Sequence, residues 1–190
     1  MLNPKIDDWF KFKGWVPHNY QIELNNKLSN LNSALVIAPT GGGKTLAGFI
    51  PAIADIIKET PKGLHTLYIS PLKALANDIE RNLEFPIKEM ELDITLETRT
   101  GDTKQSKRNS QKHNPPNFLM TTPESFILML SWETSKKFFG NLKFSQSENE
   151  KTNLNKDLIN LINSRKAWCA SSTHYNEEEL CGMAHIRLKK

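Results

Sequence analysis

The stretch VIAPTGGGKT, residues 36–45, decides the fold of this chain. An apolar run, 34–38, reads as a buried strand, and a helical pattern, 44–57, begins directly after the glycines. A glycine-rich loop between a strand and a helix lets backbone N–H groups approach phosphate oxygens. Lys44 would then place a cation at the β- and γ-phosphates of a nucleotide, and the Thr45 hydroxyl would ligate Mg²⁺. The predicted phosphate-binding residues are Ala38, Pro39, Thr40, Gly41, Gly42, Gly43, Lys44 and Thr45.

Strand-like and helical segments alternate along the first 144 residues. The strand-like runs are 34–38, 65–70, 94–100 and 117–122, and the helical ones are 44–57, 72–83 and 123–132. Such alternation predicts an α/β fold, a parallel sheet with helices on both faces. The alternative interpretation of residues 38–45, a glycine-rich turn with a chance lysine, fits this context less well.

Composition and charge are those of a globular protein with a mild basic excess. The chain has 190 residues, 38% of them hydrophobic, and a net charge of +4. This length suits one domain plus a fragment, and the charge suits a polyanionic partner. The two cysteines, Cys169 and Cys181, predict no disulfide scaffold and favour the cytoplasm. The longest nearly apolar run, 47–57, is interrupted by Asp55, so we expect no membrane span.

Four segments match, in order and spacing, motifs of the superfamily 2 helicases. They are APTGGGKT (38–45), YISPLKALANDIERNL (68–83), TRTGDT (98–103) and TTPESF (121–126). From about residue 5 to 144 the chain resembles the N-terminal RecA-like lobe of the large helicase-related (Lhr) branch of DEAD/DEAH-box proteins. The resemblance implies a RecA-like sheet, ATP with Mg²⁺ as the cofactor, and nucleic acid as the partner, with DNA favoured over RNA.

The resemblance also assigns individual residues. Gln21, after GWVPHNY, matches a glutamine that hydrogen-bonds adenine, although one exposed polar residue of a helix would look the same. The residues implied to hold the sugar-phosphate backbone of one strand are Pro71, Leu72, Lys73, Asn77, Arg99, Gly101, Thr121, Thr122, Pro123 and Glu124. Hydroxyls, N–H groups and a lysine hold a phosphate chain without reading bases. Thr122 and Glu124 are equally suited to capping a helix.

A basic stretch lies between these motifs. It consists of Arg99, Lys104, Lys107, Arg108 and Lys112, with Asp102 as the single opposing charge. The stretch suits a phosphate contact or a solvated helix face, and the sequence leaves both open.

The acidic motif that such helicases need for hydrolysis is missing. FFGNLKF (138–144) leads into SQSENEKTN (145–153) where the family has an apolar strand ending in Asp-Glu, and neither an S-A-T motif nor a second RecA lobe follows. We therefore expect an incomplete sheet that leaves Phe126, Leu128 and Leu130 uncovered, and ATP binding without hydrolysis or unwinding. A second helicase lobe in trans is a possible partner. The glutamates 177–179 are better explained as a solvated loop than as replacement acids.

The last part of the chain looks different. Residues 145–163 read as a polar linker and a helix, and 164–190 resemble the start of the C-terminal Rossmann-like domain of 3-deoxy-D-manno-octulosonic acid (Kdo) transferases. The matching residues are Trp168, Ala170, Ser172, Thr173, His174, Glu177, Glu178, Ala184 and His185, with Asn176 in place of a glycine. We interpret the gene as a fusion at GNLKF (140–144). Two cysteines and two histidines in the tail have no common zinc-finger spacing.

The sequence thus predicts three parts: a partial helicase ATP-binding domain (1–144), a linker and helix (145–163), and a glycosyltransferase-like fragment (164–190). The expected function is ATP and nucleic-acid binding by part of an Lhr-like helicase. The alternatives are a non-catalytic nucleic-acid-binding module and a Kdo transferase fragment. The strand-like AWCAS (167–171) could pair into the gap expected in the sheet.

Overall fold

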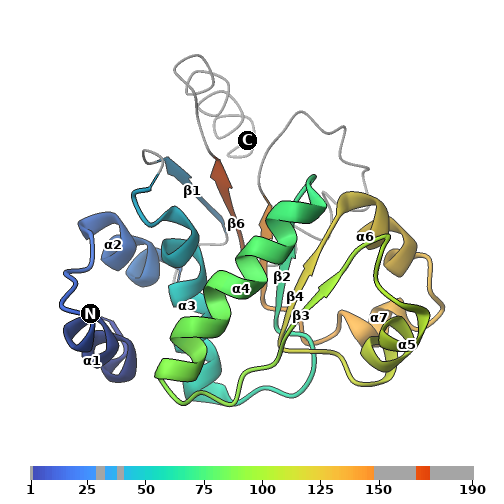
Figure 1. Cartoon of the computed structure of the whole chain (residues 1–190), viewed down its shortest axis with the longest axis horizontal. Helices are drawn as coiled ribbons and strands as arrows, with labels where there is room; N and C mark the ends of the chain where they lie inside the picture. The colour runs from blue at the N-terminus through green and yellow to red at the C-terminus, as the bar shows by residue number, and fades with distance from the viewer. Residues whose placement is uncertain (1, 29–32, 38–40, 148–165, 172–190) are drawn as a thin grey trace.

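A parallel sheet of six strands runs through the middle of the molecule (Figure 1). The computed structural model describes residues 2–28, 33–37, 41–147 and 166–171. The strands are β1 (Ser33–Ile37), β2 (Thr66–Ile69), β3 (Leu96–Arg99), β4 (Phe118–Thr121), β5 (Phe144–Ser147) and β6 (Lys166–Ser171). They lie in the order β1-β6-β5-β2-β4-β3, and every neighbouring pair is parallel. All six carboxyl ends therefore lie at one edge of the sheet.

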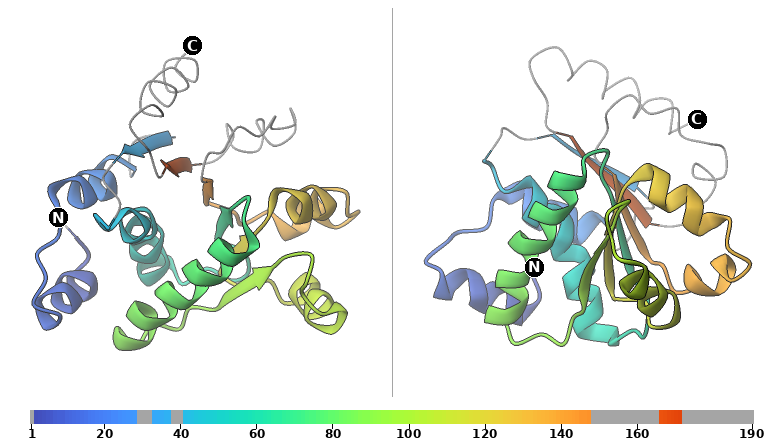
Figure 2. Two further views of the ribbon diagram at one scale, coloured as in Figure 1. Left: turned by 45° about the horizontal axis from the view of Figure 1, so that its top comes forward. Right: turned by 45° about the vertical axis from the view of Figure 1, so that its right-hand side comes forward.

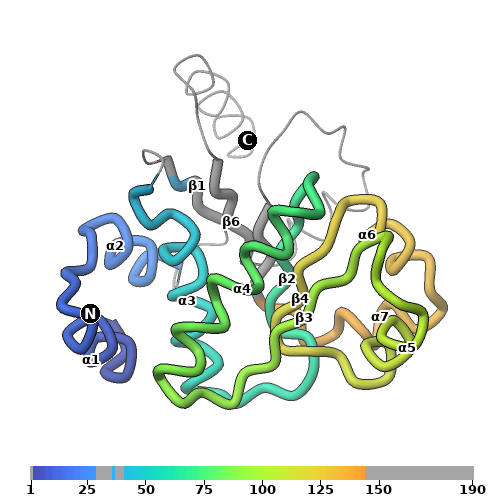
Figure 3. Tube along the Cα trace, viewed as in Figure 1, coloured from blue at the N-terminus to red at the C-terminus, as the bar shows by residue number. Residues whose placement is uncertain are grey.

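Helices follow most of the strands and carry the chain back to the amino edge of the sheet (Figure 3). They are α1 (Pro4–Phe12), α2 (Asn19–Leu28), α3 (Lys44–Glu59), α4 (Lys73–Glu89), α5 (Gln105–His113), α6 (Pro123–Leu130) and α7 (Ser135–Phe138). The helices expected from the sequence correspond to α3, α4 and α6, so the α/β prediction is confirmed. None of the helices in the described ranges has the length and apolar character needed to cross a bilayer.

The two faces of the sheet carry different helices because neighbouring side chains of a strand point in opposite directions. Tyr68 and Phe118 pack on one face with α1, α3 and α4. Leu67, Ile69 and Leu119 pack on the other face with α6 and α7. Figure 2 shows these two groups of helices on either side of the strands. The arrangement is a three-layer sandwich, as the runs of fully buried residues in β2 and β4 require.

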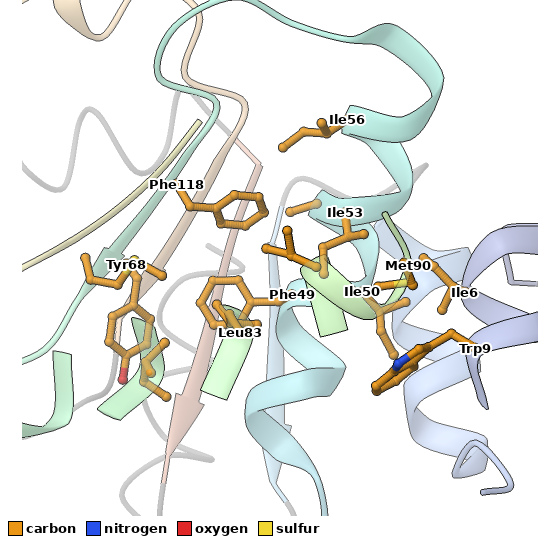
Figure 4. Packing of buried hydrophobic residues seen from close by; sticks show 14 of the residues in the cluster. Ile6, Trp9, Phe49, Ile50, Ile53, Ile56, Tyr68, Leu83, Met90 and Phe118 are labelled. Carbon is orange, nitrogen blue, oxygen red and sulfur yellow. The ribbon is translucent and has the colours of Figure 1, made fainter. Parts of the chain in front are cut away.

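Aromatic side chains fix α3 against the sheet. The ring of Phe49, on α3, lies 5.8 Å from that of Tyr68 and 5.7 Å from that of Phe118, measured between centroids (Figure 4). Leu83 from α4 and Trp9 from α1 belong to the same cluster. The helix that follows the glycine-rich loop is thereby anchored one turn below its first residue.

The sheet is more complete than the sequence suggested. β5 pairs with β2 on one side and β6 on the other, so the expected vacancy beside β2 is filled. AWCAS was predicted as a strand that could pair into the gap of the sheet, and it does form β6, which lies between β1 and β5 rather than beside β2. The polar SQS of β5 forms a strand because both neighbours supply backbone hydrogen-bond partners.

The burial of the apolar side chains of α6 also differs from the expectation. Phe126 is fully buried in the α6–α7 cluster rather than uncovered, and Leu130 packs against that cluster as a partly buried residue. Leu128 is 63% exposed, as predicted.

A charged network joins α3 to the starts of β2 and β5. The buried ring of His65 lies between Asp55 and Thr66: Nε2 is 2.9 Å from Asp55 Oδ2, and Nδ1 is 2.9 Å from Thr66 Oγ1. Lys143 Nζ is 3.2 Å from the same Asp55 oxygen and also pairs with Glu59. Burial raises the pKa of Asp55, but the hydrogen bonds from His65 and Lys143 outweigh it, and the pKa is lowered overall.

This network predicts a loss of stability in mild acid. Burial lowers the pKa of His65 below its ordinary value, so the folded chain holds the ring neutral. As the pH falls below about 6.5, unfolding takes up a proton, and the free energy of unfolding should drop by up to about 1.4 kcal/mol per pH unit. Urea unfolding between pH 8 and pH 5 measures this slope. The His65→Asn chain should lose the histidine part of the slope, whereas His113→Asn, at the exposed end of α5, should keep it; equal slopes in all three chains would contradict the assignment.

Candidate nucleotide and nucleic-acid site

The glycine-rich loop has the backbone geometry that its sequence predicts. Gly41 and Gly43 have φ of 80° and 78°, in the left-handed region that favours glycine, and α3 begins at Lys44. A Cβ atom at Gly43 would come within 2.9 Å of the Gln21 side-chain nitrogen. Gly43 also has no side chain with which to cap α3. The first N–H groups of α3 are therefore suited to an anion. Of the predicted loop residues, 38–40 lie outside the described ranges.

Gln21 lies directly against this loop. Its side chain accepts a hydrogen bond from the backbone N–H of His18 (2.9 Å) and donates one to the carbonyl oxygen of Gly43 (3.2 Å). Gln21 is 2% exposed, so the alternative of an exposed helix residue is wrong. The structure brings Gln21 and the loop together, and the adenine contact remains a prediction.

Tyr20 lies beside this loop, and only its place next to Gln21 in the sequence could have pointed to it. Its ring stacks on that of His18 at 5.4 Å between centroids, and its hydroxyl has no hydrogen-bond partner among the described residues. A Cβ atom at Gly43 would lie 3.6 Å from that hydroxyl. Burial raises the pKa of Tyr20, so the hydroxyl stays a donor at neutral pH.

A cavity of about 390 Å³ opens beside the start of α3. Gly43, Thr45 and Leu46 form one wall, and the other walls come from the end of α1 and the second half of α4. The aromatic side chains that line it are Trp9, Trp15 and Phe85. Sequence reasoning missed this cavity because its walls come from three helices that are far apart along the chain.

An ion pair closes the α1–α4 end of the cavity. Lys13 Nζ lies 2.7 Å from Glu89 Oε1, and the indole N–H of Trp9 donates to Glu89 Oε2 at 2.7 Å. The hydrogen bond from Lys13, together with that from Trp9, lowers the pKa of Glu89. Lys13 also lies over the Trp15 ring, 5.6 Å from its centroid, so the cavity combines aromatic walls with a paired charge.

The three predicted nucleic-acid segments meet at the carboxyl edge of the sheet. Ile69, Thr121 and Arg99 lie side by side across β2, β4 and β3, and the segments follow directly after them. Pro71, Leu72, Lys73 and Asn77 lie at the start of α4, and Gly101 follows β3. Leu72 is 56% exposed. The three segments, which are separate in the sequence, therefore lie next to one another at one edge of the sheet.

The third segment, residues 121–124, also stabilises the fold. Thr122 is the N-cap of α6, because its hydroxyl accepts from the backbone N–H of Ser125 at 3.4 Å, and Pro123 and Glu124 form the first turn. The buried Thr121 hydroxyl donates to the carbonyl oxygen of Arg99 at 2.7 Å. The capping interpretation therefore holds for Thr122, and the contact of these residues with nucleic acid stays a prediction.

The basic stretch divides into two groups. Arg99 is engaged inside the chain: its guanidinium donates to the carbonyl oxygen of Arg108 at 2.9 Å and lies 4.7 Å from the centroid of the Trp132 ring. Burial, with the nearby Arg108, lowers the pKa of Arg99. Lys112 also lies over Trp132, at 5.3 Å. Lys104 and Lys107 instead line an open polar cleft.

The residues present fit a nucleotide and its Mg²⁺. Gly41 and Gly43 adopt left-handed conformations, and Gly43 leaves no space for a Cβ atom. Together with the Tyr20 hydroxyl, which has no hydrogen-bond partner among the described residues, they form a polar cradle. Lys44 and Thr45 are the residues that would meet phosphate and metal there. Within the described ranges no group of three His, Cys, Asp or Glu side chains could hold a metal. Three of the four tail residues considered for zinc, His174, Cys181 and His185, lie outside these ranges.

Comparison with known proteins identifies the family of this chain. The model of the DEAD/DEAH box helicase family matches residues 18–145. The Lhr helicase/uracil glycosylase of Escherichia coli is 38% identical over an alignment of 150 residues that covers 69% of this chain and 10% of that protein. The ATP-dependent helicase Lhr-Core of Methanocaldococcus jannaschii is 35% identical over an alignment of 162 residues that covers 76% of this chain and 19% of that protein. This chain thus spans a fifth or less of these relatives.

Solved structures agree with the sequence matches. The Mycobacterium smegmatis helicase Lhr bound to ssDNA and AMP-PNP is 32% identical, with a TM-score of 0.79 over 94% of this chain and 26% of that one. The DUF1998 helicase MrfA, 21% identical with a TM-score of 0.81 over 98% of this chain and 31% of that one, shares the fold. None of these comparisons supports the Kdo transferase resemblance, which stays a prediction from sequence. Because the family model covers more than half of it, the chain belongs to the DEAD/DEAH box helicases, and the Lhr relatives support the Lhr-like branch of superfamily 2.

Proposed function

We propose that this chain is a RecA-like lobe that binds Mg²⁺-ATP at the glycine-rich loop and a single nucleic acid strand, DNA rather than RNA, along the carboxyl edge of its sheet. The observation that carries the proposal is the contact between Gln21 and Gly43, which joins the predicted adenine residue to the phosphate loop. The Lhr relative solved with ssDNA and AMP-PNP supports the same pair of ligands.

Each residue has a definite task in this proposal. Lys44 neutralises the β- and γ-phosphates, Thr45 ligates Mg²⁺, and Gln21 recognises adenine. The bound Mg²⁺ supplies charge neutralisation to the phosphates. The strand lies over the starts of α4 and α6, where backbone N–H groups and Lys73 meet its phosphates.

ATP binding without turnover is the second part of the proposal. Residues 148–190, which follow β5, contain no Asp-Glu pair to hold the metal and orient water. An arginine in trans alone contributes roughly three to five powers of ten in rate. A partner lobe in trans would be needed for hydrolysis, and unwinding by this chain alone is not expected.

Thermal unfolding with and without Mg²⁺-ATP tests the binding site. At about a hundred times its dissociation constant, ATP should stabilise the chain by about 2.7 kcal/mol, a rise in Tm of roughly 5 to 10 °C for a domain of this size. Lys44→Ala should unfold at the same temperature without ATP and lose the rise. DNA-stimulated ATP hydrolysis that disappears in Lys44→Ala would contradict the proposed lack of turnover.

A further inference from the structure

An ion pair occupies the centre of the predicted nucleic-acid surface. Lys73, the first residue of α4, holds its Nζ atom 2.9 Å and 3.0 Å from the two carboxylate oxygens of Asp102. The pair is open to solvent, with side-chain exposures of 52% for Lys73 and 77% for Asp102. A Cβ atom at Gly101 would lie 3.4 Å from Lys73 Nζ, so the lysine lies against the bare glycine backbone.

The loop that carries Asp102 is held in place by other contacts. The guanidinium of Arg108 donates to the carbonyl oxygens of Thr100 and Gly101, at 3.0 Å and 2.6 Å. The Thr103 hydroxyl accepts from the Thr100 N–H at 2.9 Å. Because an exposed ion pair contributes little to stability, the fold has little need of the Lys73–Asp102 pair.

A polar cleft of about 300 Å³ adjoins the pair, between α4 and α5. Its lining residues are Asn77, Glu80, Thr98, Thr100, Asp102, Thr103, Lys104, Ser106 and Lys107. Amide, hydroxyl and ammonium groups of this kind make most contacts to a sugar-phosphate backbone. Glu80 already accepts from the Thr98 hydroxyl at 2.7 Å. Of the two acids in this cleft, Asp102 is therefore the one that pairs with Lys73, which is predicted to bind a phosphate.

We infer that the Asp102 carboxylate takes the place of a backbone phosphate at Lys73, so that an entering strand must displace it before reaching Lys104 and Lys107. The inference rests on the proposed nucleic-acid function. A carboxylate and a phosphodiester both present two oxygens to an ammonium group, and they compete for it. Asp102 acts as an internal competitor that weakens binding until the phosphates of a strand outweigh one carboxylate.

The test is a set of oligodeoxythymidine-binding measurements by fluorescence anisotropy at about 0.1 M salt, repeated at lower salt for any chain that does not bind there. Asp102→Asn should bind about three- to tenfold more tightly than the wild type, because Lys73 is released and one repulsive charge is lost. Asp93→Asn is the matched control: it removes the same charge from an exposed position at the other end of β3. It should change the affinity less than about twofold, because the Debye length at 0.1 M salt is about 10 Å.

The same substitutions made in a Lys73→Ala chain separate competition for Lys73 from the general effect of removing a negative charge. Lys73→Ala should weaken binding, and adding Asp102→Asn to it should gain no more than Asp93→Asn does. An equal gain from Asp102→Asn in both backgrounds, or weaker binding by Asp102→Asn alone, would overturn the inference. If the wild type fails to bind, binding by Asp102→Asn but not by Asp93→Asn supports the competition, and binding by both variants contradicts it. If no variant binds at low salt, the proposed nucleic-acid function itself has failed, and the inference fails with it.

Discussion

Removal of residues 145–190 is expected to abolish both cooperative unfolding and ATP binding. Among the described strands β1 pairs only with β6, and β6 reaches β2 only through β5. Without these two strands, β1 and the glycine-rich loop have no backbone partner in the sheet, and each buried unpaired N–H or carbonyl group costs roughly 1–3 kcal/mol. Circular dichroism during heating, with and without Mg²⁺-ATP, measures both losses.

The matched control is a shorter deletion. Removing residues 172–190 keeps all six strands, so the chain should still unfold cooperatively and keep its rise in Tm with ATP. If the chain of residues 1–144 unfolds as sharply as the full chain and gains the same stability from ATP, pairing with β6 is not what holds β1 and the glycine-rich loop in place.

Phe49→Ala is expected to destabilise the chain by about 3–5 kcal/mol, which is a large part of the stability of an ordinary domain. Phe49 is fully buried, and its ring lies between Tyr68 and Phe118. Loss of the ring leaves a cavity between α3 and the sheet, directly below the glycine-rich loop. Urea unfolding of the two chains at one pH gives the difference.

An exposed phenylalanine provides the control for this change. Phe12, at the end of α1, is 79% exposed, so Phe12→Ala should change the free energy of unfolding by no more than about 0.5 kcal/mol. A loss below about 1 kcal/mol for Phe49→Ala would contradict the packing of α3 described above.

Local patterns in the sequence predicted the parts of the fold that local patterns determine. The apolar runs of β2 and β4 are buried on both faces, and the Pro at the first turn of α6 follows a threonine that caps it. The phosphate loop could be predicted because Gly41 and Gly43 occupy backbone conformations that other residues avoid. The family resemblance singled out Gln21, but neither the resemblance nor a local pattern predicted its contact with Gly43.

The remaining features depend on partners that are distant along the chain. The polar segment of β5 has no apolar alternation, and its strand is imposed by pairing with β2 and β6. The cavity beside Thr45 needs α1, α3 and α4 to meet. The Lys73–Asp102 pair joins two loops whose proximity follows from β2, β4 and β3 lying side by side. No single-sequence pattern contains such information.

The position of β6 also bears on the order in which the molecule is assembled during synthesis. β1 leaves the ribosome well before the strand with which it pairs, because Ser33 is the partner of Ala167. The strands β2, β3 and β4 can pair with one another earlier. Pairing between segments so far apart is slow because a long loop must close first. The nascent chain therefore exposes an unpaired β1 edge until β6 has been made, and the glycine-rich loop that follows β1 reaches its final position late.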